Sequence, residues 1–210
     1  MIIAARRSAI GRAGGMFASI DVEDLAAPVM QATLADANIP PDHLDDVILG
    51  NAAGPGGNIA RLSALHAGFP KSIPGVTVDR QCGSGLEAVM MACNLIMAGA
   101  GTTYLAGGVE SQSRAPLRTL PASGDLHEHP YNRARFAPDA IGDPDMGAAA
   151  DTVAKQFNIS RERQDAFALR SQQRATKARA AEVFDAEIVS ISDHAADECI
   201  RDTMTADRLA

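Results

Sequence analysis

Short apolar runs alternate with longer segments of helical periodicity in the first half of the chain. The runs that predict buried strands are Met1–Ala5, Val47–Gly50, Val76–Val78 and Tyr104–Ala106. The segments that predict helices between them are Val22–Asn38, a short stretch ending near Gly68, and Cys82–Gly99. Alternating strands and helices are typical of an α/β layered fold with a mostly parallel sheet.

The predicted helix at Cys82–Gly99 is unusually apolar. Its apolar side chains recur at helical spacing at Leu86, Val89, Met90, Cys93, Ile96 and Met97. Glu87 is its only charged residue. We therefore expect this helix to be buried on most sides, with Cys93 filling space in the core.

The character of the sequence changes after Glu110. The segment Ser111–Pro144 is rich in proline and polar clusters, which is typical of loops. Helices are predicted at Gly147–Asn158 and Arg161–Phe184, and a returning strand at Glu187–Ile191. We therefore expect an α/β core over residues 1–110, an inserted helical and loop domain over 111–186, and a return strand with a truncated acidic tail over 187–210.

Composition narrows the class of protein. Of the 210 residues, 46% are hydrophobic and 21% are charged, as in ordinary globular domains. The net charge of −7 argues against nucleic-acid binding through the overall field. The longest apolar stretch, Ala88–Gly101, is too short to span a membrane. Arg6, Arg7 and Arg12 interrupt any signal-peptide core, so we expect a soluble, cytoplasmic protein.

Three cysteines, Cys82, Cys93 and Cys199, are too few and too scattered for a disulfide framework or a cysteine zinc site. Cys82 follows a predicted strand and opens a predicted helix with Gly83 and Gly85. The N–H groups and positive dipole end of a helix favour the nucleophilic thiolate, and glycines leave room for a bulky substrate. Cys82 is therefore either a nucleophile or a structural cysteine in a tight glycine turn. Cys199 is assigned no role.

The segment Asp79–Val89 resembles the nucleophile segment of the thiolases, a family of acyl-CoA acyltransferases. Other segments resemble the same family in the same order along the chain: Arg7–Arg12, Asp46–Asn51, Gly57–Arg61, Ala106–Ser113, Met146–Ala150 and Ile159–Ala168. The match covers essentially the whole chain, and it implies the N-terminal half of a thiolase-like layered α/β fold with an inserted helical and loop domain.

The resemblance implies roles for particular residues. Cys82 would become acylated by acyl-CoA, and its backbone N–H would share in an oxyanion hole. Met146 would line the acyl and thioester pocket, with a packing methionine as the alternative, and Gly83 and Gly85 would admit the substrate. Some short-chain thiolases have His directly before that methionine. Asp145 stands there in this chain, which leaves the preferred acyl length open.

Thiolases also carry a catalytic His in a G-H-P-type motif and a second Cys in a C-x-G motif. Neither is present in this sequence: His129–Pro130 follows Glu128, and Cys199 is not followed by the required glycine. The chain thus looks cut after its first half, and we expect it to be inactive alone. In the family two such halves pack face to face, so one half alone should expose an apolar helix face.

The expected function is acyl transfer between acyl-CoA and acetyl-CoA in lipid metabolism, through an acyl-cysteine intermediate. Coenzyme A is the carrier substrate, no metal or redox cofactor is expected, and the resemblance implies a homo-dimer or homo-tetramer. The alternatives are a non-catalytic half that a partner chain complements and a related condensing enzyme.

Two weaker patterns remain. The loop Gly54–Asn58 superficially resembles a dinucleotide loop, but Ile59 stands where the third glycine would fall. A basic face on one predicted helix could meet the phosphates of coenzyme A or could be a solvated surface; it consists of Arg163, Arg170, Arg174 and Lys177.

Overall fold

A computed structural model describes residues 1–122, 129–131 and 133–209. These residues form two compact units. Unit 1 comprises residues 1–116 and 184–199, and unit 2 comprises residues 117–183 and 200–210. The return strand predicted after residue 186 thus lies in the same unit as the first half of the chain.

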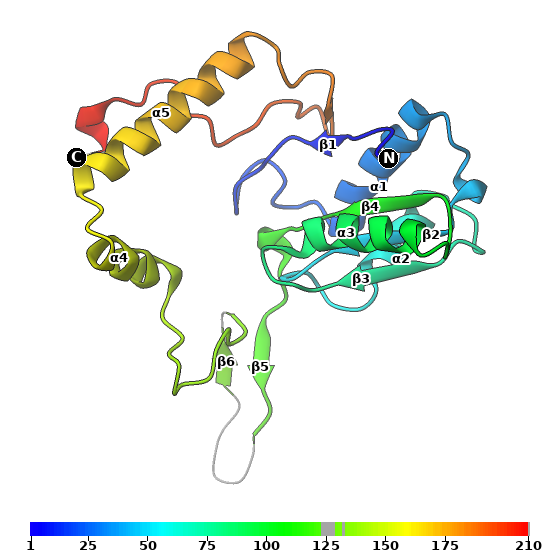
Figure 1. The fold of residues 1–210 in the computed structure, drawn as a ribbon, viewed down its shortest axis with the longest axis horizontal. Coiled ribbons are helices and arrows are strands. Elements are labelled where there is room, and N and C mark those ends of the chain that lie inside the picture. Colours follow the sequence, from blue (N-terminus) through cyan, green and yellow to red (C-terminus); the bar gives the residue numbers. More distant parts are fainter. Residues whose placement is uncertain (123–128, 132, 210) are drawn as a thin grey trace. The chain divides into compact units, whose positions relative to one another are not determined.

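The centre of unit 1 is a three-stranded parallel sheet. It contains β2 (Asp46–Gly50), β3 (Gly75–Val78) and β4 (Tyr104–Gly108), in the order β3-β2-β4 (Figure 1). Ile48 in the central strand pairs with Val76 and with Ala106. These strands match the apolar runs of the sequence. Because all three are parallel, their carboxyl ends meet at one edge of the sheet.

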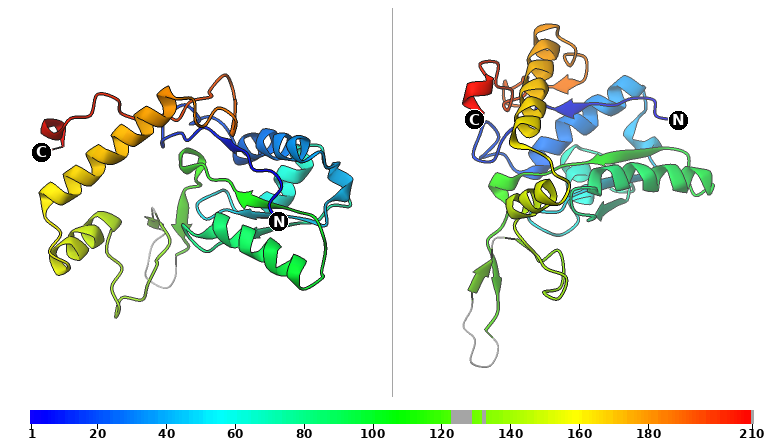
Figure 2. Two further views of the ribbon diagram at one scale, coloured as in Figure 1. Left: turned by 45° about the horizontal axis from the view of Figure 1, so that its top comes forward. Right: turned by 60° about the vertical axis from the view of Figure 1, so that its left-hand side comes forward.

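Helices cover both faces of this sheet. The helices α1 (Val22–Ala37) and α2 (Ile59–His66) pack on the face formed by Val47, Leu49 and Leu105. The helix α3 (Ser84–Met97) packs on the opposite face, against Ile48 and its neighbours (Figure 2). Both faces of the strands are therefore apolar, as the uninterrupted apolar runs predicted.

The predicted strand at Met1–Ala5 is wrong. The first strand is β1 (Arg7–Ser8), which pairs in parallel with β7 (Ile188–Val189). Residues 1–3 are exposed. The described residues offer these apolar side chains neither a strand partner nor a covering surface, so the apolar run alone does not make a buried strand.

Unit 2 has few buried side chains. A hairpin of β5 (Arg118–Leu120) and β6 (His129–Tyr131) lies within the segment expected to form loops. The helices α4 (Met146–Gln156) and α5 (Arg161–Ala180) follow, and neither contains a buried residue.

Across both units, short 3-10 turns occur at Pro41–His43, Gln112–Arg114 and Ala206–Arg208. Within the described part of the chain, no helix combines the length and apolarity needed to cross a membrane.

Candidate active site

Cys82 lies in the turn that joins β3 to α3. The helix begins at Ser84 with Gly83 as its N-cap, slightly later than the sequence indicated, so Cys82 directly precedes the cap. Its side chain is exposed. The turn leaves the carboxyl end of β3, where the ends of β2 and β4 also lie. This edge is where α/β sheets commonly bind ligands.

Backbone donors are free beside the cysteine. The N–H groups of Cys82, Gly85 and Leu86 have no hydrogen-bond acceptor among the described residues. Unpaired N–H groups in a first helical turn carry partial positive charge and bind anions. The turn therefore combines a nucleophilic atom with donors suited to a developing oxyanion.

Hydrogen bonds hold this turn together from within. The backbone N–H of Arg80 donates to the hydroxyl of Ser84 at 2.8 Å, and that hydroxyl donates to the carbonyl oxygen of Gln81 at 2.6 Å. The N–H of Gln81 donates to the carboxylate of Asp79 at 2.8 Å. On the outside, the guanidinium of Arg80 forms an ion pair with Glu87. The turn is thus a closed local network.

Glycines allow the start of α3 to touch the sheet. A Cβ added to Gly50 would lie 2.5 Å from the backbone nitrogen of Gly85. A Cβ added to Gly108 would lie 3.2 Å from the Cα of Gly85. The ends of β2 and β4 thus press directly against the first turn of the helix. This close packing fixes where the helix begins, and with it the position of the turn that carries Cys82.

The carboxylate of Glu110 fastens the loop that follows β2. It accepts hydrogen bonds from the backbone N–H groups of Ala52 and Ala53 at 2.8 and 2.9 Å and from the side-chain amide of Asn51 at 3.1 Å. The N–H of Asn51 also donates to the carbonyl of Val78. Sequence analysis assigned no role to Glu110, Asn51 or Ser84, although all three lie in the segments that carried the family resemblance.

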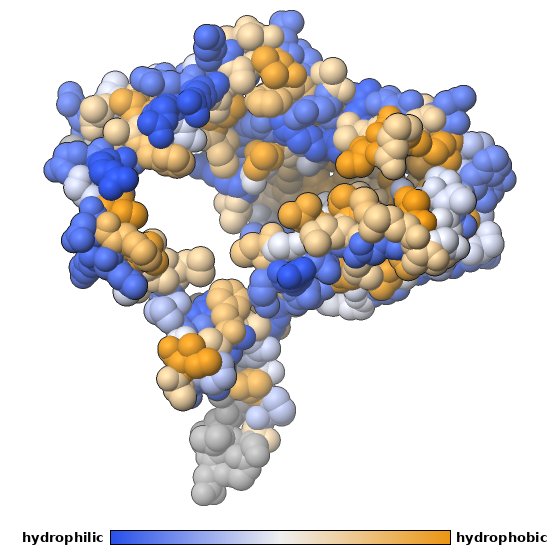
Figure 3. All heavy atoms as spheres, in the orientation of Figure 1, coloured by the Kyte–Doolittle hydropathy of each residue, from blue (hydrophilic) through white to orange (hydrophobic). Residues whose placement is uncertain are grey.

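The expectation that Cys93 is a core residue is wrong. Cys93 is exposed, and so is Cys199. The helix α3 packs on the sheet through Ala88 and Ala92, so Cys93 lies on its outward face. Other apolar residues of α3 are also exposed: Leu86, Met90, Ile96 and Met97. Figure 3 shows apolar side chains gathered over α3.

The other predicted site residues lie in different surroundings. A Cβ added to Gly83 would make only an ordinary van der Waals contact, 3.4 Å from the carbonyl oxygen of Arg80. Gly85 faces the backbone of Gly107 and Gly108 in β4. Met146 is the first residue of α4 in unit 2, preceded by Asp145 as N-cap, and is exposed. The contacts of Gly83, Gly85 and Met146 with substrate stay predictions. Glu128, the residue before His129–Pro130, lies outside the described residues.

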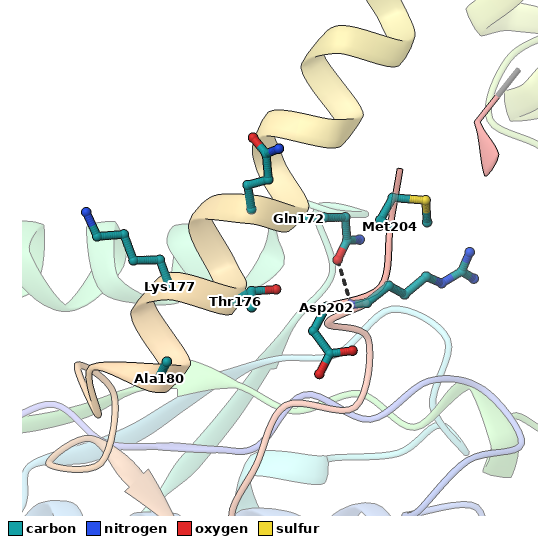
Figure 4. A pocket seen from close by; sticks show the side chains of 8 residues that line it. Gln172, Thr176, Lys177, Ala180, Asp202 and Met204 are labelled. Carbon is teal, nitrogen blue, oxygen red and sulfur yellow. Dashed lines mark hydrogen bonds between the residues drawn. The ribbon is translucent and has the colours of Figure 1, made fainter. Parts of the chain in front are cut away.

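A hollow of about 240 Å³ lies in unit 2 between α5 and the segment around Arg201. Gln172 and Thr176 line it from the helix, and Gln172 accepts a hydrogen bond from the backbone N–H of Arg201 at 2.7 Å (Figure 4). The buried hydroxyl of Thr176 has no partner among the described residues. Cys82 is not part of this hollow.

The predicted basic face of α5 is exposed along its whole length. Within the described part of the chain, none of its four cations forms an ion pair, although Arg170 lies over the ring of Phe167. Both interpretations of this face, phosphate contact and solvated surface, stay open. The described residues contain no cluster of three or more His, Cys, Asp or Glu side chains suited to a metal ion.

Comparison with known proteins places this geometry in a family. The model of the thiolase N-terminal domain matches residues 1–210. The chain is 48% identical to "Putative acetyl-CoA C-acetyltransferase YhfS" of Bacillus subtilis over 97% of its length, and 49% identical to "Putative acetyl-CoA C-acetyltransferase VraB" of Staphylococcus aureus over 82%. The crystal structure of the Bacillus anthracis acetyl-CoA acetyltransferase superposes on 99% of the chain with a TM-score of 0.86 and 34% identity.

The chain therefore belongs to the thiolase family and has the layered α/β fold of that family. This confirms the resemblance noted in the sequence. The chain spans about half the length of the relatives it matches: 51% of YhfS, 46% of VraB and 56% of the Bacillus anthracis chain. It corresponds to their N-terminal half.

Proposed function

We propose that this chain is the nucleophile-bearing half of an acyltransferase that moves acyl groups between acyl-CoA and acetyl-CoA. The observation that carries the proposal is the exposed sulfur of Cys82, directly before the N-cap of α3, with unpaired backbone N–H groups next to it. A thiolate is the attacking form of cysteine, and such donors stabilise the oxyanion that forms during acyl transfer.

In the first step the Cys82 thiolate attacks the thioester carbonyl of acyl-CoA. A bond forms between Sγ and the acyl carbon, the bond from that carbon to the coenzyme A sulfur breaks, and coenzyme A leaves as a thiolate that takes up a proton. The unpaired N–H group of Cys82 is suited to hold the oxyanion between these events. In synthesis the carbanion of acetyl-CoA then attacks the acyl carbon, so that a carbon–carbon bond forms and the bond from that carbon to Sγ breaks. In the degradative direction the acyl-cysteine forms from 3-ketoacyl-CoA with release of acetyl-CoA, and the thiol of coenzyme A then takes the acyl group from Sγ.

In this proposal, a second half outside this sequence carries the acid/base groups that transfer protons and form the carbon–carbon bond. Coenzyme A serves as carrier, with no metal or redox cofactor. We further propose that the complete protein works in the cytoplasm, in lipid metabolism, as a homo-dimer or homo-tetramer. The alternative is a natural half that a partner chain complements, and the only observation in its favour is that the chain spans about half of each relative. The coding sequence beyond residue 210 decides between one long chain and two complementary chains.

Alkylation of the cysteines tests the nucleophile. All three cysteines are exposed, so accessibility alone gives none of them an advantage, and Cys93 and Cys199 serve as controls inside the same molecule. We expect iodoacetamide to label Cys82 well ahead of the other two near neutral pH, measured by mass spectrometry of peptides. Equal labelling of all three would overturn the proposal that Cys82 is activated.

Turnover tests the need for a second half. We expect the 210-residue chain to show negligible thiolysis of acetoacetyl-CoA, because the residues that move protons are missing. The assay follows loss of acetoacetyl-CoA by absorbance, with a Cys82→Ser variant as the blank. Robust turnover that disappears in this variant would mean that acid/base groups are present in this half after all.

A further inference from the structure

The turn that carries Cys82 contains a residue in an unfavourable backbone conformation. Gln81, directly before the cysteine, has φ 52°, in the left-handed region that residues other than glycine rarely adopt. The side chain of Gln81 is exposed, so packing of that side chain does not hold it there. Another group must hold the backbone in this conformation.

The hydroxyl of Ser84 is placed to do this. It accepts a hydrogen bond from the backbone N–H of Arg80 at 2.8 Å and donates one to the carbonyl oxygen of Gln81 at 2.6 Å. The hydroxyl oxygen of Ser84 thus bridges the backbone N–H of Arg80 and the carbonyl oxygen of Gln81, one on each side of the Cα of Gln81. The side chain of Ser84 is buried, where water competes little for these bonds.

Ser84 is itself held firmly. It is the first residue of α3, and the end of β2 at Gly50 packs directly against it. Its backbone N–H donates to the same Gln81 carbonyl at 3.1 Å. The hydroxyl therefore connects the turn to the closely packed contact between α3 and the end of β2.

We propose that Ser84 is a positioning residue for the reaction. Its hydroxyl holds Gln81 in the left-handed conformation and thereby keeps the sulfur of Cys82 beside the unpaired N–H groups at the start of α3. This inference rests on the proposed function of Cys82 as nucleophile, and Ser84 acts through the backbone of the turn.

The test measures the ratio of Cys82 labelling to Cys93 labelling by iodoacetamide in the 210-residue chain. Ser84→Ala removes both hydrogen bonds of the hydroxyl, and we expect the ratio to fall about three- to tenfold. Ser63→Ala is the matched control, because Ser63 is a buried serine of α2 whose hydroxyl has no partner among the described residues. It should leave the ratio unchanged.

Changes at Gln81 separate positioning from general stability. Glycine adopts positive φ without strain, so Gln81→Gly in the Ser84→Ala background should restore most of the ratio. Valine disfavours positive φ strongly, so Gln81→Val should lower the ratio in an otherwise unchanged chain. Because Gln81 is exposed, these variants should keep their fold, which circular dichroism checks.

The outcomes distinguish this inference from the proposed function. Equal labelling of Cys82 and the other cysteines in the wild-type chain overturns both. A wild-type preference for Cys82 that survives Ser84→Ala, or a failure of Gln81→Gly to restore it, overturns only the role of Ser84. If Ser84→Ala does not fold, the comparison of Gln81→Val with Gln81→Gly decides, and equal ratios in that pair overturn the proposal.

Discussion

At the scale of single residues, Gly50 sets the distance between the sheet and the helix that follows Cys82. A Cβ on Gly50 would lie 2.5 Å from the backbone nitrogen of Gly85 and would also overlap Ser84. These are atoms of a helix start that cannot yield without moving α3. We expect Gly50→Ala to lower the free energy of unfolding by about 2–3 kcal/mol, measured by urea titration, and to lower Cys82 labelling with it.

Gly107 is the matched control for this change. It lies in β4 of the same sheet, and a Cβ there would meet nothing within 4 Å. Gly107→Ala should therefore change the free energy of unfolding by less than about 1 kcal/mol. Equal losses of stability in the two variants would show that the close approach at Gly50 does not determine the position of α3.

At the scale of elements, charges from the two ends of unit 1 fasten β1 to the residues on either side of β7. Arg7 donates to Glu187 at 2.6 Å and to Asp197 at 2.8 and 3.1 Å. Asp197 also accepts the backbone N–H of Ile10 at 2.8 Å and is only 12% exposed. Arg12 pairs with Glu198 in the same region. Because Asp197 is shielded from water, its contacts should contribute more to the free energy of unfolding than a surface ion pair does.

These contacts predict a dependence of stability on pH. The hydrogen bonds from Arg7 hold the pKa of Asp197 below its usual value, and the N–H of Ile10 adds to this effect. A lowered folded-state pKa stabilises the fold above the unfolded value of about 4, and this contribution is lost as the pH falls through the folded value. We expect Asp197→Asn to cost about 1–2 kcal/mol near pH 6 and progressively less as the pH falls below about 4, measured by urea unfolding.

The control for this substitution is Asp193→Asn in the same segment. Asp193 is exposed, forms no ion pair within the described part of the chain, and has φ 65°, which asparagine tolerates as well as aspartate does. The free energy of unfolding of the Asp193→Asn variant should match that of the wild-type chain throughout the titration. A loss in Asp197→Asn that persists unchanged at pH 2 would contradict the electrostatic explanation.

The elements that the sequence predicted well are those with local signals. Helical periodicity located α1 and α3, and short apolar runs located the three parallel strands, within a few residues. The sequence missed β1, because its pairing with β7 joins residues nearly the whole chain apart and no local pattern marks Arg7–Ser8 as a strand. It also missed the β5–β6 hairpin in a segment rich in proline.

At the scale of the whole molecule, the candidate site was only partly predictable. The strand–cysteine–glycine–helix order predicted the location of Cys82, because that pattern is local. The roles of Ser84, Gly50 and Glu110 depend on contacts among the ends of separate strands, which no spacing in the sequence reveals. The outward position of Cys93 was missed because a helix with apolar residues on most of its sides does not show which side meets the sheet.

The outward face of α3 is apolar and exposed, and this chain spans about half the length of its relatives. Leu86 is 68% exposed and Met97 is 78% exposed, and Met90 lies between them on the same face. Exposed apolar patches of this kind drive association. The relatives are about twice as long as this chain, and the family resemblance implies a second half that packs face to face with the first. We therefore expect that half to cover α3 in the complete protein.

This expectation predicts opposite effects of one variant in two contexts. In the 210-residue chain, Leu86→Glu with Met90→Glu should reduce self-association, seen as a lower average mass in sedimentation. In the complete protein the same pair should prevent stable folding, because it buries charge between the halves. Leu117→Glu, an exposed apolar residue of unit 2, is the control and should leave self-association unchanged. Normal folding of the complete double variant would show that α3 faces water there too.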